Sequence, residues 1–345
     1  ETPAQAEAAN LLAGVFERQG RLDDLADLLR RQLDAARDRE DARAVTDLSM
    51  KLGALLEKRG DEHGALDVYH RALDWDAQSK EALRAVLRLS IQLDNSVDLG
   101  NALEKLLDVE DGEEAAHLAV ELAGLRSAHG DAPGAERALA DGFAKCPGSE
   151  QLLNMLTERY AASGAFEKVA AAYAARSRAL TVPADRIEAL CRAAEVLSER
   201  AADPGGAADV LEEALAVDPR ERDVLLALID ACEAAGKPER AIAAVTASIA
   251  AVPEDPWLYR SRAALHDAAG RADLALLDLS RAQDRSGGGY TGEYLAALEG
   301  AIERARRGAP LPEDRPEREL RISLAELAAR SGDLERARAQ GALVL

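Results

Sequence analysis

Aromatic residues are scarce in this sequence: 3% of its 345 residues are Phe, Trp or Tyr, whereas 48% are apolar. An interior of this composition is built mostly from Ala and Leu, which are both strong helix formers. A β-sandwich or a parallel sheet would need far more Val, Ile, Tyr and Phe. The composition therefore predicts an all-α protein.

Basic residues and long apolar runs are also in short supply. Lys and Arg number 43 against 63 Asp and Glu, which gives a formal net charge of -20. Nucleic acids and anionic membranes attract basic surfaces, so this charge argues against both as partners and favours basic peptides or proteins. No apolar run approaches the roughly 18 residues of a membrane-spanning helix, and no signal peptide is apparent. We expect a cytoplasmic protein without membrane insertion.

The usual catalytic patterns are missing as well. The three cysteines have no paired spacing, and we expect them to be reduced and structural; they are Cys146, Cys191 and Cys232. The five histidines form neither an H-E-x-x-H motif nor a zinc-ligand cluster. The Gly-rich stretch from Ser286 to Gly292 matches no phosphate-binding loop. The sequence therefore predicts no catalytic residues, no metal and no cofactor.

A repeated frame is present throughout the chain: a glycine that ends an apolar helical stretch is followed five residues later by a small residue. Gly130 and Gly164 are 34 residues apart, as are Gly236 and Gly270, whereas Gly20 and Gly60 are 40 apart. The pairs are Gly60/Ala65, Gly130/Ala135, Gly236/Ala241, Gly270/Ala275 and Gly332/Ala337, with variants at Gly20/Leu25, Asp94/Leu99, Gly164/Val169 and Ala202/Ala207. We expect eight helix-turn-helix units over residues 1–285.

Each unit has a physical rationale. Glycine adopts the left-handed conformation that ends the first helix, and the small residue lets the second helix pack closely on the first. Proline then closes several second helices, at Pro147, Pro219 and Pro253. One helix pair cannot bury its apolar face alone, so the pairs must stack on one another.

One copy carries a family resemblance. Leu52-Gly53, Leu56, Gly60, Ala65, Tyr69 and Ala72 resemble the tetratricopeptide repeat (TPR) signature in order and spacing. The resemblance implies a right-handed superhelical solenoid of antiparallel helix pairs, similar to long TPR arrays of bacterial proteins. HEAT or armadillo units remain an alternative because of the 40-residue interval. A long coiled coil is disfavoured because Pro and Gly interrupt the chain too often.

The pattern changes after residue 285. A Gly/Pro-rich break over residues 286–314 surrounds one amphipathic stretch, and a partial further unit follows over residues 315–345. The apolar face of that stretch comprises Tyr294, Leu295, Leu298 and Ile302. Because the chain starts without Met and stops inside a repeat, we expect it to be part of a longer protein. An incomplete last helix also predicts contact with another copy.

The resemblance further implies that the first helix of each pair lines a binding groove. The candidate groove residues are Asp47, Lys51, Asn154, Glu158, Asp223, Asp230, Trp257 and Arg260. This groove is acidic. Chaperone-binding TPR domains clamp a carboxylate with Lys and Asn, and because only Asn154 lies near such a position, we do not expect that activity. Trp257 is the favoured anchor, although it could instead cover the preceding repeat.

These features predict a non-enzymatic scaffold that binds a protein or peptide of basic character in its groove. Two alternatives remain open. The chain could be the regulatory or substrate-recruiting TPR region of a larger multidomain enzyme. It could also be a structural array that forms homo-oligomers through its terminal repeats.

Overall fold

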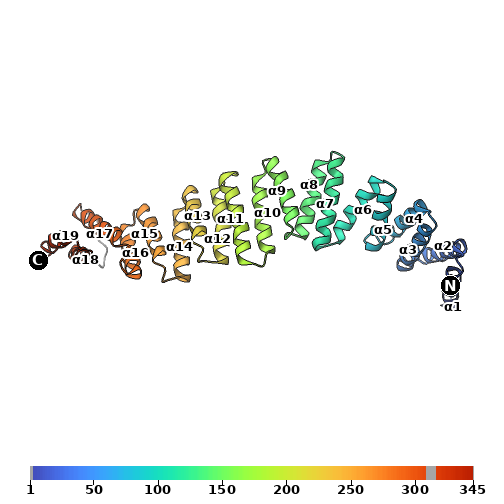
Figure 1. Cartoon of the computed structure of the whole chain (residues 1–345), viewed down its shortest axis with the longest axis horizontal. Helices are drawn as coiled ribbons and strands as arrows, with labels where there is room; N and C mark the ends of the chain where they lie inside the picture. The colour runs from blue at the N-terminus through green and yellow to red at the C-terminus, as the bar shows by residue number, and fades with distance from the viewer. Residues whose placement is uncertain (1–2, 308–315, 345) are drawn as a thin grey trace. The chain divides into compact units, whose positions relative to one another are not determined.

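The computed structural model describes residues 3–307 and 316–344, and every regular element within them is an α-helix (Figure 1). The chain divides into two compact units, Glu1–Ser163 and Gly164–Leu345. The division falls in the turn between α9 and α10.

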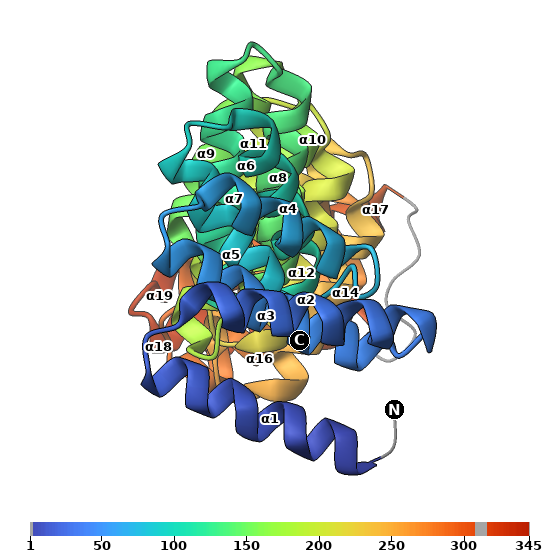
Figure 2. The same ribbon diagram turned by 90° about the vertical axis from the view of Figure 1, so that its right-hand side faces the viewer.

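The first unit contains nine helices among its described residues. They are α1 (Pro3–Arg18), α2 (Leu22–Asp38), α3 (Ala42–Lys58), α4 (Glu62–Leu73), α5 (Lys80–Gln92), α6 (Ser96–Val109), α7 (Gly112–Ala128), α8 (Ala132–Lys145) and α9 (Glu150–Ala162). Each helix packs on the next one in the chain. Figure 2 looks onto the side of this unit that carries the N-terminus and shows α1 beside α2.

The second unit contains ten helices among its described residues. They are α10 (Phe166–Ala179), α11 (Pro183–Glu199), α12 (Pro204–Val217), α13 (Arg222–Ala234), α14 (Pro238–Ala251), α15 (Pro256–Ala268), α16 (Ala272–Ser286), α17 (Thr291–Arg306), α18 (Glu317–Arg330) and α19 (Leu334–Gly341). One core cluster of Ala, Leu, Val and Ile side chains runs from α10 to α16. The Ala-rich composition thus produces closely packed helix pairs.

Helix α17 packs between α16 and α18. The four apolar side chains expected on one face of this stretch, Tyr294, Leu295, Leu298 and Ile302, are all buried in a second cluster with Leu276 of α16 and Leu320 of α18. The Gly/Pro segment expected at Gly308–Pro312 lies outside the described residues.

The turn after α3 shows how the local sequence reverses the chain. Gly60 adopts a φ of 76°, and its N–H donates to Glu57 O at 2.9 Å. The N–H of Asp61 reaches back to Leu56 O at 2.9 Å, while the Asp61 carboxylate accepts from Gly64 N at 3.0 Å. The glycine therefore ends α3, and the aspartate that follows caps the first turn of α4.

Three turns place a residue other than glycine in the same left-handed region: Glu40 (φ 56°), Asp94 (φ 52°) and Ala202 (φ 53°). Asp94 and Ala202 occupy the two degenerate copies of the sequence frame. Glu40 lies halfway between Gly20 and Gly60 and joins α2 to α3. The interval between these glycines is long because α2 and α3 have 17 residues each, whereas α14 and α15, between Gly236 and Gly270, have 14 and 13. Among the three, Ala202 has no polar side chain to stabilise the left-handed conformation.

We expect Ala202→Gly to raise the free energy of unfolding by about 0.5–1 kcal/mol. Relief of left-handed strain, about 1–2 kcal/mol, outweighs the greater freedom of glycine in the unfolded chain. Urea denaturation followed by helical circular dichroism measures the change. Gly236→Ala, at an equivalent turn with a φ of 66°, should shift stability in the opposite direction. If the urea concentration at the unfolding midpoint of Ala202→Gly were equal to or below that of the parent chain, Ala202 would not be strained in this turn.

Candidate interaction surface

The eight candidate groove residues all lie on first helices of their pairs. Asp47 and Lys51 are exposed on α3, and Asn154 and Glu158 are exposed on α9, all within the first unit. In the second unit, Asp223 and Asp230 are exposed on α13, Arg260 is exposed on α15, and Trp257 of α15 is half-buried. Within each unit the candidates thus occupy two helices, and in the second unit these are consecutive first helices.

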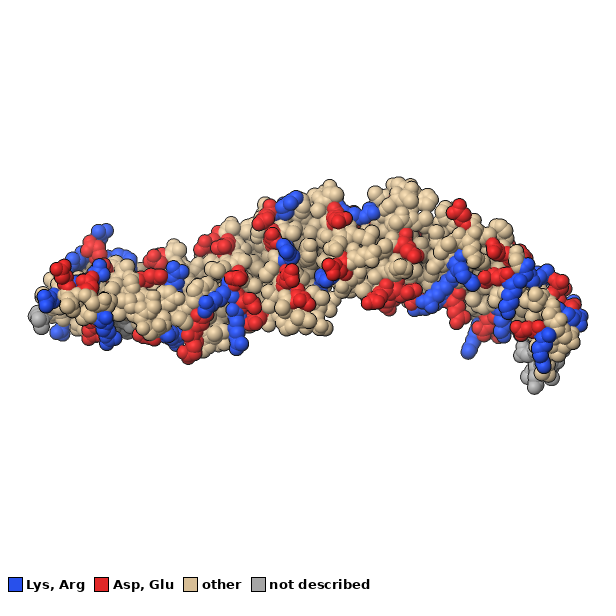
Figure 3. Space-filling view, in the orientation of Figure 1, with Lys and Arg blue, Asp and Glu red and all other residues tan. Residues whose placement is uncertain are grey.

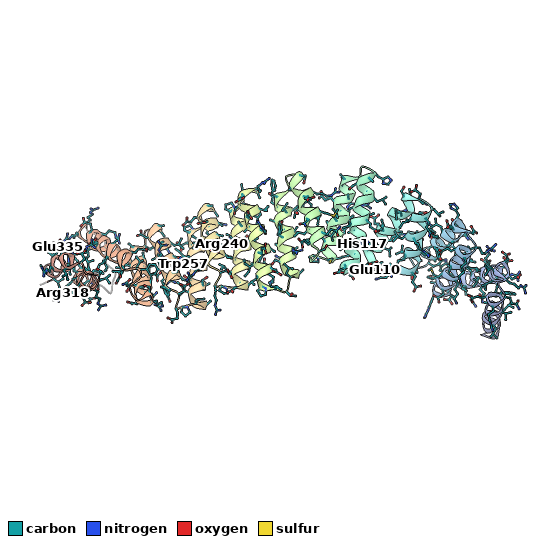
Figure 4. All side chains as sticks on the ribbon, in the orientation of Figure 1. Glu110, His117, Arg240, Trp257, Arg318 and Glu335 are labelled. Carbon is teal, nitrogen blue, oxygen red and sulfur yellow. The ribbon has the colours of Figure 1, made fainter. Side chains whose placement is uncertain are left out.

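Basic side chains of α5 neutralise acids in the first unit. Arg88 Nη2 lies 2.8 Å from Glu57 Oε1, and Arg84 Nη2 lies 2.7 Å from Glu110 Oε1. Lys80 donates to Glu110 Oε2 at 2.6 Å, and this hydrogen bond lowers the pKa of Glu110 (labelled in Figure 4). These ion pairs bind α5 to α3 and to the loop after α6, so they contribute to the packing of the unit.

One face of α13 is different. Asp223, Leu226, Asp230 and Glu233 recur at the three- and four-residue spacing that places side chains on one helix face. All four are exposed, and Leu226 retains 45% of its accessible surface. None of the three carboxylates has an ion pair with any residue that the structure describes. This face therefore presents an apolar side chain surrounded by free negative charge.

Sequence reasoning identified Asp223 and Asp230 but missed Leu226 and Glu233. A leucine in an apolar helix is ordinarily assigned to the core, and Leu225 next to it is indeed only 1% exposed. The usable signal was the spacing, since Leu226 lies three residues after Asp223 and four before Asp230.

Trp257 joins α15 to the preceding repeat. Its ring packs against the main core cluster of the second unit, and the guanidinium carbon of Arg222 lies 5.4 Å from the ring centroid. Asp255 caps α15 by accepting from Trp257 N at 3.1 Å, and it also binds Arg222 at 2.9 Å. The position of Trp257 (Figure 4) thus combines a packing role with partial exposure.

A shallow pocket of about 220 Å³ lies between the first turns of α13 and α15. Leu225, Val252 and Leu258 supply its apolar lining, and the remaining lining residues are Pro219, Arg220, Glu221, Arg222 and Asp255. On α15 itself, Arg260 Nε lies 3.1 Å from Glu293 Oε2 of α17. Ion pairs therefore connect α13 with the start of α15, and α15 with α17, and they leave the α13 face free.

Several other features bear on chemistry. Within the described part of the chain, no three His, Cys, Asp or Glu side chains come together as a metal-binding group. Burial raises the pKa of the Cys191 and Cys232 thiols, which disfavours their reactive thiolate forms.

None of the helices in residues 3–307 and 316–344 is long and apolar enough to cross a membrane. On the face shown in Figure 3, acidic and basic side chains are interspersed along both units.

Pairs of antiparallel helices joined by left-handed turns define a helical-repeat protein. Residues 200–265, which run from the turn before α12 into α15, match the family described as tetratricopeptide repeat. This part of the chain is therefore similar to tetratricopeptide repeats, in agreement with the resemblance noted around Gly53 and Tyr69. No curated protein matches the chain.

Among solved structures, the chain is similar to a tetratricopeptide repeat protein from Parabacteroides merdae, with 16% identity, coverage of 81% of this chain and 92% of that one, and a TM-score of 0.31. It is similar to human IFIT1, in a dimer with PPP-AAAA, with 14% identity, coverage of 95% and 79%, and a TM-score of 0.36. A chain in the Naa15/Naa10 complex bound to HypK-THB shares 17% identity, with coverage of 91% and 57% and a TM-score of 0.31.

Proposed function

We propose that this chain is a protein-binding scaffold of the cytoplasm that performs no chemistry itself and holds a basic segment of a partner protein on the first-helix face of its second unit. The observation that supports this is the free charge on α13. Asp223, Asp230 and Glu233 are exposed and have no ion pair within the described residues, whereas Arg222 and Arg260 beside them are engaged with Asp255 and Glu293. A surface of this kind attracts cationic side chains.

Free carboxylates on one helix face are not required by the packing of α13. The opposite face provides that packing through Val224, Leu225 and Leu228, each no more than 4% exposed. Burial of these apolar side chains stabilises the helix pair. The exposed face is therefore available for a partner, and Leu226 offers it an apolar contact.

The proposal is tested by capturing partner proteins on the immobilised chain and eluting with salt. Binding should fall strongly at about 1 M salt, where the screening length is about 3 Å. Asp223→Asn combined with Asp230→Asn should lower capture at low salt several-fold, and Trp257→Ala should lower it further. Circular dichroism checks that each variant keeps its helices. Capture that resists salt and all three substitutions would exclude this surface.

A further inference from the structure

His266 differs from the other histidines of the chain because it is buried. All five histidines lie within the described residues, and four of them are exposed or half-buried, whereas His266 retains 7% of its accessible surface. Its ring lies in the last turn of α15. Nδ1 is buried without a hydrogen-bond partner among the described residues, and Nε2 lies 3.9 Å from Asp278 Oδ2, beyond hydrogen-bond distance. Packing, rather than polar contacts, therefore holds the ring.

The nearby carboxylate of Asp278 is already bound by arginines. Arg262 donates from Nε to Oδ2 and from Nη2 to Oδ1, at 2.7 Å each, and Arg281 Nη1 lies 3.4 Å from Oδ1. The side chains of Arg262 and Asp278 retain only 13% and 3% of their accessible surface. One buried carboxylate thus serves two guanidinium groups, and little of its negative charge is left for a third cation.

The other charged groups that act on His266 come from α14 and from the turn before α16. Glu239 of α14 and Arg271 of that turn bind each other. Arg240, the next residue of α14, is engaged by two acids of α12. Asp267, beside His266 on its own helix, is exposed. The two carboxylates that attract a proton to His266, those of Asp278 and Glu239, therefore both have an arginine partner already.

A proton on His266 would be costly in this environment. Both ring nitrogens of an imidazolium are donors, and the buried Nδ1 has no acceptor. Burial penalises the charged ring, and Arg262 and Arg271 repel it, so these effects outweigh the attraction of Asp278 and lower the pKa of His266. In the unfolded chain the pKa of a histidine is about 6.5. Folding therefore favours the neutral ring, and the stability that this provides is complete above about pH 6.5 and is lost as the pH falls toward the lowered pKa.

The cost of the proton falls on one end of one helix pair. Helix α15 packs on α16, and the Arg262–Asp278 ion pair joins the two. His266 lies at the end of the pair where the chain turns, and its carbonyl accepts from Arg271 N at 2.8 Å. Residues beside an exposed turn open at a lower free energy than a packed core. Opening at this end lets water reach the ring and removes the penalty on the proton.

We propose that His266, Arg262 and Asp278 form a proton-operated catch, which holds the last turn of α15 against α16 at neutral pH and releases it as the pH falls below about 6.5. The proton comes from the solvent and binds a ring nitrogen of His266. Helix α15 also carries Trp257 and Arg260, so the catch gives acid a route to this part of the candidate surface. The catch requires no partner and does not depend on the proposed function.

The test measures amide hydrogen exchange of the whole chain by mass spectrometry at about pH 5.5 and about pH 7.5. His266→Gln keeps a polar side chain of similar size that cannot take up a proton. Parent and variant are compared at the same pH, because the chemistry of exchange itself depends on pH. From the higher to the lower pH, exchange over residues 256–286 in the parent should accelerate up to about tenfold relative to the variant, as expected for one proton over one pH unit. Peptides from α11 and α12 should show no such change.

His63→Gln is the matched control, since His63 is exposed in the first turn of α4; this variant should behave as the parent does. A second measurement uses the unmodified chain, in which the ring protons of His266 are titrated by nuclear magnetic resonance. Their midpoint should lie below about pH 6.5. A midpoint at or above that pH, or the same pH dependence of exchange in the parent and in His266→Gln, would overturn the catch. If His266→Gln fails to fold, the titration decides alone.

Discussion

Replacing Gly53 with Ala is expected to lower the free energy of unfolding by about 3 kcal/mol, at the upper end of the usual cost of overpacking a core. A Cβ atom at this position of α3 would overlap the Cε1 and Cζ atoms of the Tyr69 ring. The ring cannot move away easily, since Tyr69 is only 2% exposed and its hydroxyl donates to Glu57 at 2.7 Å. Burial and this hydrogen bond both raise the pKa of Tyr69, so the ring stays neutral. The substitution therefore forces α3 and α4 apart.

Gly124→Ala is the matched control for this prediction. Gly124 lies inside α7, and a Cβ atom there would meet no other atom within 4 Å. Because alanine is the better helix former, we expect this variant to gain about 1 kcal/mol. Urea denaturation of both variants gives the comparison. If Gly53→Ala were as stable as Gly124→Ala, the close contact between Gly53 and Tyr69 would not hold α3 against α4.

The sequence predicted these elements because their causes are local. Each turn is set by residues within one short stretch, as at Gly60, Asp61 and Ala65. The glycine ends one helix, the aspartate caps the next, and a small residue follows five positions after the glycine. The pairing of Gly53 with Tyr69 belongs to the same kind of pattern, since both residues lie within one repeat. Local patterns thus predicted the helices and their turns, and the match of residues 200–265 to tetratricopeptide repeats agrees with the resemblance that they carry.

The state of the surface charges could not be predicted in this way. Arg222 and Asp255 are 33 residues apart, and only the stacking of repeats brings them within 2.9 Å. The same Arg222 lies over the ring of Trp257, which the sequence favoured as an anchor while leaving open that it covers the preceding repeat. Leu226, one residue from a core leucine, was assigned no role. An acid stays free when no arginine of a neighbouring repeat reaches it. The contacts between repeats that decide this are visible only in the folded structure.

Replacing Arg262 with Met is expected to lower the free energy of unfolding by about 3 kcal/mol, the cost of leaving a buried charge without its partner. Two nitrogens of Arg262 donate to the Asp278 carboxylate at 2.7 Å each, which joins α15 to α16. Asp278 is only 2% exposed. Its other neighbours replace Arg262 poorly: Arg281 lies 3.4 Å away on the solvent side, and burial lowers the pKa of His266, so its ring is neutral at pH 7.

The double variant Arg262→Met/Asp278→Leu distinguishes the loss of a charge partner from the loss of packing. With both charges removed, an apolar contact replaces the ion pair, and buried ion pairs can often be replaced in this way at little net cost. We therefore expect the double variant to recover most of the stability that Arg262→Met loses. The coupling between the two sites should then be at least about 2 kcal/mol in a denaturation cycle. If the stability losses of the two single substitutions simply added up, the ion pair would not be the source of the loss. Arg262 would then stabilise α15 through its contacts with Tyr259 and Thr246.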